Sequence, residues 1–164
     1  MMKFKVFVEV GAGGNVKYEV DEKTKELKVD RFLHSAIVFP FNYGSIEGTR
    51  GKDGDPLDAL VLSEMPVEPG VVIECHPIGL LDMEDEKGID TKIIAVPDVE
   101  IDPIFGKYDN IDDVPKPTLE EIEHFFKNYK VLEPGKWVKI GDYKSNKEAE
   151  KLLVDSQEVT PKGE

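Results

Sequence analysis

Apolar and polar residues alternate along two neighbouring segments near the start of the chain, residues 4–10 and 16–20. This period of two is the pattern of a half-buried β-strand. A glycine-rich stretch, residues 11–15, joins the two segments, so the sequence predicts a β-hairpin here. Apolar runs over residues 27–32 and 57–62 predict further strands. The first half of the chain is therefore expected to be mainly β structure.

The segments that follow continue the strand pattern around one long loop. Residues 40–58 are rich in Gly and Asp and predict a loop with little regular structure, of the kind that usually has a function. Residues 71–81 form an apolar run, and residues 89–96 predict the strand that returns beside it. The single cysteine, Cys75, lies in the first of these runs, so we expect its thiol to be buried and inert.

Helical patterns come late in the chain. Residues 118–121, Thr-Leu-Glu-Glu, form a capping box with Thr118 as the N-cap. Apolar residues at spacings of three and four follow from Leu119 to Tyr129 and predict a helix with one face on the core. A second, shorter helix is predicted to begin at Ser145. Strands first and helices later indicate an α+β fold with a small, closed or partly closed barrel.

The size and charge of the chain narrow the classes of function. Its 164 residues suit one domain, which we expect over residues 1–155, followed by a polar tail over residues 156–164. The net charge of −13 repels phosphate backbones and argues against a nucleic-acid partner. No apolar stretch approaches the ~18 residues that cross a membrane. The charged N-terminus also lacks the pattern of a signal peptide, so we expect a soluble, cytoplasmic protein without a membrane partner.

The densest cluster of chemically useful residues is an acidic loop. Asp53, Asp55 and Asp58 lie close together in a segment shaped by Gly and Pro. Gathering three carboxylates costs repulsion unless a cation lies among them, and oxygen ligands favour hard ions such as Mg²⁺ or Mn²⁺. A solvated acidic loop explains the same spacing equally well. An EF-hand calcium loop does not fit, because Leu57 takes a ligand position and Asp58 takes the place of the required glycine.

The other polar side chains of interest are ordinary when each is taken alone. Asp85 and Asp90 bracket a predicted turn, Tyr129 lies on the apolar helical stripe, and Lys130 suits a helix C-terminus. Together, carboxylates for hard cations beside Lys and Tyr groups suit a small oxygen anion with a high charge. This combination indicates phosphoryl chemistry.

The run Asp53–Ala59, with the sequence DGDPLDA, resembles the signature of the family I soluble inorganic pyrophosphatases of the prokaryotic type. Other segments agree with the family in sequence and spacing over residues 3–153. They are Lys17–Glu19, Val29–Phe32, Asn42–Gly44, Asp85–Lys92, Ala95–Pro97, His124–Phe126, Tyr129–Lys130 and Gly135–Lys139. The resemblance implies an OB-like five-stranded β-barrel with flanking α-helices. It also implies a homohexamer that hydrolyses pyrophosphate with a metal-activated water and several Mg²⁺ ions, for which Mn²⁺ is a possible substitute.

The resemblance further implies roles for individual side chains. Asp55 is expected to accept the proton of the attacking water. The metal ligands are expected to be Asp53, Asp58 and Asp90, joined by Asp85 when further ions bind. The phosphate-binding residues are expected to be Lys17, Arg31, Tyr43, Lys92, Tyr129 and Lys130. Glu9 and Glu19 are expected to support the metals and the lysines from behind.

Two departures from the family pattern and three rival functions remain. The turn over residues 11–15 is short compared with some relatives, so we expect a slight shift of Glu9. Phe39 stands where many members have a tyrosine, so one hydroxyl near the site is absent. A Mg²⁺-dependent hydrolase of nucleoside phosphates or polyphosphates would need groups that grip a base, and none is clustered here. A non-catalytic oligonucleotide-binding barrel conflicts with the negative charge. A calcium buffer would bind metal but would release no phosphate.

Overall fold

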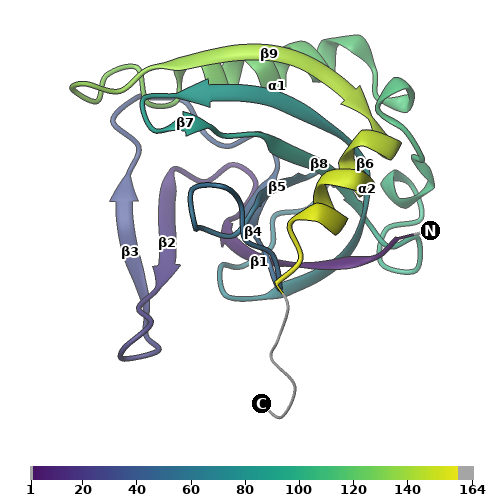
Figure 1. Cartoon of the computed structure of the whole chain (residues 1–164), viewed down its shortest axis with the longest axis horizontal. Coiled ribbons are helices and arrows are strands. Elements are labelled where there is room, and N and C mark those ends of the chain that lie inside the picture. The colour runs from purple at the N-terminus through teal and green to yellow at the C-terminus, as the bar shows by residue number, and fades with distance from the viewer. Residues whose placement is uncertain (1, 159–164) are drawn as a thin grey trace.

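The computed structural model of the chain describes residues 2–158, which form a β-barrel with two flanking α-helices (Figure 1). The strands are β1 (Phe4–Val10), β2 (Val16–Val20), β3 (Leu27–Phe32), β4 (Asn42–Ile46), β5 (Asp58–Val61), β6 (Val72–Asp85), β7 (Gly88–Ile89), β8 (Lys92–Pro97) and β9 (Val138–Ser145). The helices are α1 (Lys116–Asn128) and α2 (Asn146–Asp155), and two short 3₁₀ helices, η1 (Phe105–Lys107) and η2 (Ile111–Asp113), precede α1. No helix within residues 2–158 is long and apolar enough to cross a membrane.

Five strands close the barrel. In order around it, β1 pairs with β4, β4 with β5, β5 with β8, β8 with β6, and β6 again with β1. The β5–β8 pair is parallel and the other four are antiparallel. Strand β6 is 14 residues long, and its far end pairs with β7 and β9 outside the closed ring. The predicted α+β class and the OB-like barrel with flanking helices are confirmed.

Two apolar cores hold this arrangement together. One core takes side chains from all five barrel strands, such as Val8, Ile46 and Ile93, and is covered by Ala149 and Leu153 of α2. The other lies under α1, whose predicted apolar stripe is buried except for Leu119, which is half-buried. Successive residues of β8 serve the two cores in turn, so every residue of this strand is buried. Cys75 is buried in the first core, as expected, and burial raises the pKa of its thiol.

The hairpin predicted between residues 4–10 and 16–20 is wrong. β1 pairs with β4 along one edge and with β6 along the other, so the barrel leaves it no edge for β2. β2 instead pairs with β3 as a separate two-stranded sheet, which we call the ribbon (Figure 1). Alternation identifies a strand but does not identify its partner, and the loop length favoured the wrong partner.

The predicted loop over residues 40–58 is also wrong in part, because it contains β4. Gly44 lies in this strand opposite Val8, and a Cβ added to it would lie 1.9 Å from the carbonyl oxygen of Phe7. The glycine therefore serves a close approach of two strands, although in the sequence it resembles a loop residue.

Three smaller predictions need correction near the other elements. Helix α1 begins at Lys116 rather than after Thr118, with Pro115 as its N-cap and no side-chain cap, so the predicted capping box does not form. Strand β9 lies between the two helices, where no strand was expected. The predicted strand over residues 89–96 is divided into β7 and β8 at Asp90 and Thr91. The second helix begins after Ser145, as predicted.

The division into a domain over residues 1–155 and a tail over residues 156–164 stays a prediction, since residues 159–164 lie outside the described part of the chain. The first residues of the predicted tail are packed. Ser156 is buried, and its carbonyl oxygen accepts a hydrogen bond of 2.8 Å from the backbone N–H of Arg50.

Candidate active site

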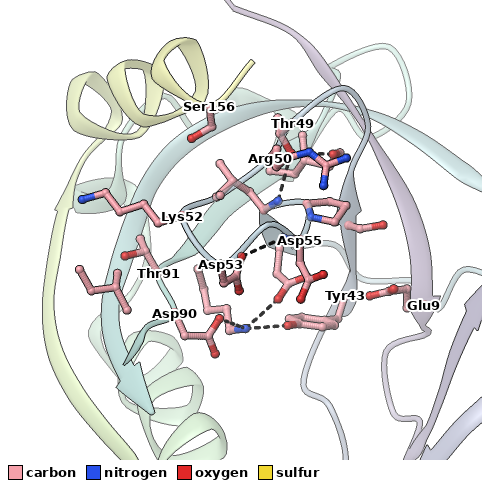
Figure 2. Close-up of a pocket in the computed structure, with 18 of the residues that line it drawn as sticks. Glu9, Tyr43, Thr49, Arg50, Lys52, Asp53, Asp55, Asp90, Thr91 and Ser156 are labelled. Carbon is pink, nitrogen blue, oxygen red and sulfur yellow. Dashed lines mark hydrogen bonds and ion pairs between the residues drawn. The ribbon is translucent and has the colours of Figure 1, made fainter. Parts of the chain in front are cut away.

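All of the side chains singled out from the sequence for a site line one cleft beside the barrel (Figure 2). These residues are Glu9, Lys17, Glu19, Arg31, Tyr43, Asp53, Asp55, Asp58, Asp85, Asp90, Lys92, Tyr129 and Lys130. They come from barrel strands, from the ribbon, from the acidic loop before β5 and from the end of α1. Folding therefore brings together residues that are far apart in the chain.

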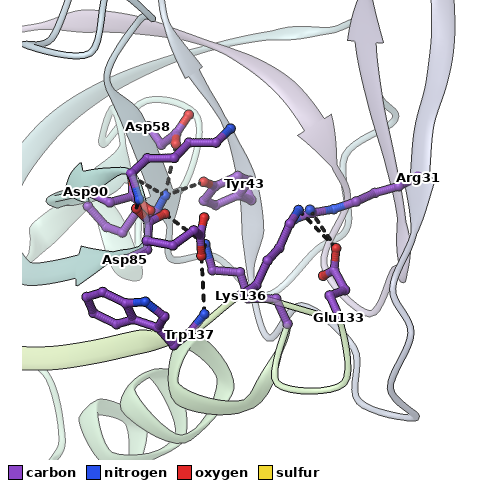
Figure 3. Close-up of polar contacts among 12 residues, drawn as sticks. Arg31, Tyr43, Asp58, Asp85, Asp90, Glu133, Lys136 and Trp137 are labelled. Atoms are coloured by element: carbon purple, nitrogen blue, oxygen red, sulfur yellow. Dashed lines mark hydrogen bonds and ion pairs between the residues drawn. The ribbon is translucent and has the colours of Figure 1, made fainter.

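One side of the cleft, which we call the barrel wall, consists of Lys92 and its three partners Tyr43, Asp58 and Asp90. The buried Lys92 side chain lies at its centre. Its Nζ lies 2.8 Å from the hydroxyl of Tyr43, 2.9 Å from Asp58 Oδ2 and 3.0 Å from Asp90 Oδ1 (Figure 3). The parallel pairing of β5 with β8 places Asp58 directly opposite Lys92, and β4 brings Tyr43 beside them. Burial alone would lower the pKa of Lys92, but the neighbouring groups, Asp58 foremost, hold it well above its ordinary value. The wall thus keeps a permanent positive charge inside the protein.

The two tyrosines frame this wall. Burial raises the pKa of Tyr43 well above its ordinary value, so its hydroxyl stays protonated. Tyr129 is buried at the end of α1, and its ring stacks on that of Phe125 at 5.3 Å between centroids. Phe39, one of the departures from the family pattern, packs with its ring centroid 5.0 Å from that of Tyr43 and 4.5 Å from that of Phe125. Phe39 therefore supports Tyr43 by packing, without a hydroxyl of its own.

A second buried ion pair joins β6 to the end of α1. Lys130 Nζ lies 2.8 Å from Asp85 Oδ2, and the backbone N–H of Lys87 donates to the other carboxylate oxygen. Burial raises the pKa of Asp85, but these two hydrogen bonds outweigh it, so the pKa lies below its ordinary value. Glu86 lies 3.6 Å from the same ammonium group.

The acidic loop is built differently, from tight turns. Asp53 Oδ1 accepts a hydrogen bond of 3.0 Å from the backbone N–H of Asp55, and the carbonyl of Asp55 accepts one of 2.8 Å from Gly51. Gly54 adopts a φ of 88°, a conformation that side chains other than glycine rarely take. Arg50 fixes the loop by bonding the carbonyl of Gly54 and pairing with Glu158 beyond α2. Asp53 and Asp55 remain exposed at the mouth of the cleft.

The ribbon supplies two cations from the opposite side. Lys17 and Arg31 are register partners on β2 and β3, which places them side by side. Lys17 Nζ lies 3.6 Å from Asp30, and Arg31 Nη1 lies 3.1 Å from Glu133 in the loop after α1 (Figure 3). The first pair lies within the ribbon, whereas the second joins the ribbon to the loop after α1.

Glu9, on β1 of the barrel, and Glu19, on β2 of the ribbon, both line the cleft. Burial raises the pKa of the Glu9 carboxyl to about 7, although Lys17 acts in the opposite direction. Glu9 is therefore close to half protonated near neutral pH when no other cation approaches it. Among the described contacts, Glu19 forms no ion pair, and it lies next to Tyr18 on β2.

The carboxylates have not gathered into a finished metal site. Within residues 2–158, no three His, Cys, Asp or Glu side chains lie close enough together to hold an ion. Asp58 and Asp90 instead share Lys92 as a counter-ion. Each of them keeps its second oxygen without a hydrogen bond from the described residues. Figure 2 shows Asp53, Asp55 and Asp90 among the side chains that line the cleft.

Sequence reasoning missed some charged side chains that line the cleft or lie beside it. Asp30 pairs with Lys17, and the buried Glu133 pairs with both Arg31 and Lys136. Lys136 belongs to a segment that carried the family resemblance, so its position in that segment was an available signal. No sequence signal pointed to Glu133, because it lies in a short loop without a motif or a periodic pattern around it.

Comparisons with known proteins identify the family of the chain. A family model described as inorganic pyrophosphatase matches residues 6–160. The inorganic pyrophosphatase of Nanoarchaeum equitans is 48% identical over 157 residues, which covers 96% of this chain and 97% of that protein. That of Aeropyrum pernix is 47% identical over 148 residues, which covers 90% of this chain and 84% of that protein. The solved structure of the Helicobacter pylori inorganic pyrophosphatase superposes with a TM-score of 0.91 at 44% identity and covers 94% of this chain and 91% of that one. Matches of this identity and coverage, in sequence and in fold alike, show that the chain belongs to the inorganic pyrophosphatase family.

Proposed function

We propose that this protein hydrolyses pyrophosphate to two phosphate ions by attack of water, with Mg²⁺ as the divalent ion that the reaction requires. The observation that carries the proposal is a single cleft in which four cationic side chains face a set of carboxylates. The cations are Lys17, Arg31, Lys92 and Lys130, and the carboxylates are Asp53, Asp55, Asp58 and Asp90. A small anion with several charges suits the cations, and divalent ions suit the carboxylates.

The donor set fits Mg²⁺ by its chemistry. Its members are carboxylates without a thiol or imidazole among them, and oxygen-only ligands favour hard ions over zinc. The free oxygens of Asp58 and Asp90, together with Asp53, are the groups that would hold the ions, and Asp85 would join them. Bound divalent ions would offset the charge of the substrate and make water more acidic. Mn²⁺, which accepts the same ligands, is proposed as a substitute.

The side chains of this cleft would then contribute to the reaction in three ways. Lys17, Arg31, Lys92 and Lys130 bind phosphate oxygens and offset the negative charge that repels a nucleophile. Tyr43 and Tyr129 donate hydrogen bonds to the same oxygens without adding charge. Glu9 and Glu19 are proposed to support the metals and the lysines as neighbouring carboxylates, without direct contact with the substrate.

Asp55 is proposed as the base of the reaction. It is exposed at the mouth of the cleft, and its carboxylate accepts no hydrogen bond from the described residues. It is therefore free to take the proton of the attacking water while the new P–O bond forms and the bond to the leaving phosphate breaks.

Phosphate release from pyrophosphate tests the proposal directly. We expect release with Mg²⁺, loss of release with EDTA, and recovery when Mg²⁺ is added in excess. The same assay with ATP should release at least tenfold less phosphate. Equal rates with ATP would favour a hydrolase of nucleoside phosphates, and release that persists in EDTA would contradict the need for a divalent ion.

We also propose the homohexamer and the cytoplasmic location that the family resemblance implies. Light scattering coupled to size-exclusion chromatography measures the first. A monomer at micromolar concentration would contradict it.

A further inference from the structure

Glu133 is a buried carboxylate that the proposed reaction does not use. Its side chain is 6% exposed, and one oxygen, Oε1, faces two cations, Arg31 Nη1 at 3.1 Å and Lys136 Nζ at 3.2 Å (Figure 3). A carboxylate at this depth is costly unless it is paired, so its position beside the cleft, against two of the cations that line it, needs an explanation.

The backbone fixes Glu133 firmly. Its N–H donates to the carbonyl of Lys130, and its own carbonyl accepts from the N–H of Lys136. Lys130 is in turn anchored on Asp85. The loop from Lys130 to Lys136 therefore holds the Glu133 carboxylate in a defined position relative to the barrel.

The partner of Glu133 is held much less firmly. Arg31 belongs to the ribbon, whose strands pair with each other and with no strand of the barrel. The ion pair to Glu133 is thus a direct link between the ribbon and the loop after α1. Without it, Arg31 and its neighbour Lys17 would depend on the position of a two-stranded sheet, which is marginally stable by itself.

The geometry of the pair leaves Arg31 able to bind a further anion. A single guanidinium nitrogen, Nη1, contacts a single carboxylate oxygen of Glu133, so the ion pair is not bidentate. Arg31 Nε and Glu133 Oε2 are both buried and have no partner among the described residues. The pair is therefore not saturated, and the remaining donors of the guanidinium group are not consumed by Glu133.

We propose that Glu133 is a positioning residue, which holds Arg31 and Lys136 together at the cleft and ties the ribbon to the loop after α1. The proposal rests on the phosphate-binding role proposed above for Arg31. The opposite reading has Glu133 compete with the substrate for Arg31. The two readings differ in sign, because loss of a positioning residue weakens substrate binding, whereas loss of a competitor strengthens it.

The test is Glu133→Gln, which keeps the shape of the side chain and removes its charge. We expect KM for pyrophosphate to rise about tenfold while kcat changes by less than about threefold, because uniform binding is lost. Glu120→Gln, on the exposed face of α1, is the control that removes one carboxylate and should change neither constant. An unchanged or lower KM for Glu133→Gln overturns the proposal.

A double-mutant cycle with Arg31→Gln separates positioning from a general structural effect. If Glu133 acts through Arg31, adding Glu133→Gln to Arg31→Gln should change KM by less than about twofold. An equal, additive effect in both backgrounds overturns the proposal. Should Glu133→Gln fail to fold by circular dichroism, Glu133→Asp takes its place in the cycle. It keeps the charge but is too short to reach both cations, and we expect a threefold rise in KM that Arg31→Gln abolishes.

Binding of imidodiphosphate, measured by calorimetry, keeps this proposal distinct from the proposed reaction. Its Kd should rise about tenfold in Glu133→Gln, whatever the rate of turnover. Tenfold weaker binding in a protein that releases no phosphate would uphold the role of Glu133 and overturn the proposed reaction. Unchanged binding in an enzyme that releases phosphate would overturn the role of Glu133 and uphold the proposed reaction.

Discussion

The barrel wall and the acidic loop both line the cleft, but they hold their carboxylates in different ways. In the wall, neighbouring strands fix Asp58 against Lys92 by their register, and the Lys92 side chain is 2% exposed. In the loop, Asp53 and Asp55 are exposed and are held by two short turns and by Arg50. The wall is therefore expected to contribute to the free energy of unfolding. The exposed carboxylates of the loop contribute little to it and can bind ions or accept a proton.

The difference in burial between the wall and the loop suggests different roles for them in the site. A buried charge that is well paired resists displacement, so the wall is suited to fix one end of an anion in a constant place. An exposed carboxylate can turn toward an incoming cation at little cost. The comparison predicts that changes in the wall reduce both stability and activity, and that changes in the loop reduce activity alone.

The largest effect is expected for Lys92→Met in the wall. It leaves Asp58 and Asp90 facing each other without their counter-ion, so the free energy of unfolding should fall by about 3–5 kcal/mol and activity should be lost. Urea unfolding in EDTA, followed by circular dichroism, measures the first. Lys139→Met, at an exposed position of β9, is the control. If both variants unfold alike, the wall does not support the fold in this way.

The next effect is expected for Asp55→Asn in the loop. Loss of a general base should lower kcat by about 10²–10⁴-fold. The free energy of unfolding should stay within about 0.5 kcal/mol of the wild type, because the side chain is exposed and unpaired among the described residues. Steady-state kinetics and urea unfolding check the two halves, with Asp142→Asn on β9 as the control. A fully active variant would remove Asp55 from the reaction.

A smaller effect concerns pH and Glu9, between the wall and the ribbon. Burial raises the pKa of Glu9 from 4.5 to about 7, so the folded state binds more protons than the unfolded state between these values. The free energy of unfolding should therefore fall as the pH rises through this window, by on the order of 1–3 kcal/mol. Glu9→Gln should remove this contribution, whereas Glu26→Gln at an exposed position should keep it. Parallel pH profiles for wild type and Glu9→Gln in EDTA would argue against a shifted Glu9.

The smallest effect is expected for Glu158→Gln, which removes the exposed ion pair to Arg50. Exposed pairs contribute little, and the backbone bonds from Arg50 to Ser156 and from Glu158 to Gly48 remain. The Mg²⁺ concentration for half-maximal activity should change less than about twofold. A tenfold change, measured by Mg²⁺ titration of the rate, would mean that the loop depends on this side chain.

The same contrast explains how much could be predicted from the sequence. The acidic loop was visible because Asp53, Asp55 and Asp58 stand together in the chain between turn-forming residues. The wall was not visible as a unit, because it depends on the register of β5 with β8, which no local pattern encodes. The family resemblance supplied Lys92 and Lys130 where spacing could not. The partner of β1 was predicted wrongly and Glu133 was missed for the same reason, since contacts between distant segments are decided by packing of the whole fold.

The parallel pairing of β5 with β8 has a consequence for how the enzyme can be made. Asp58 and Lys92 are 34 positions apart, and β6 lies between their strands in the sequence, so the whole of β6 must be placed elsewhere before β5 and β8 can pair. A partly folded chain in which these two strands have not paired would carry every residue of the wall and still lack the charge arrangement. Catalytic activity should therefore appear only after this non-local pairing, which makes turnover a stringent reporter of folding during synthesis or refolding.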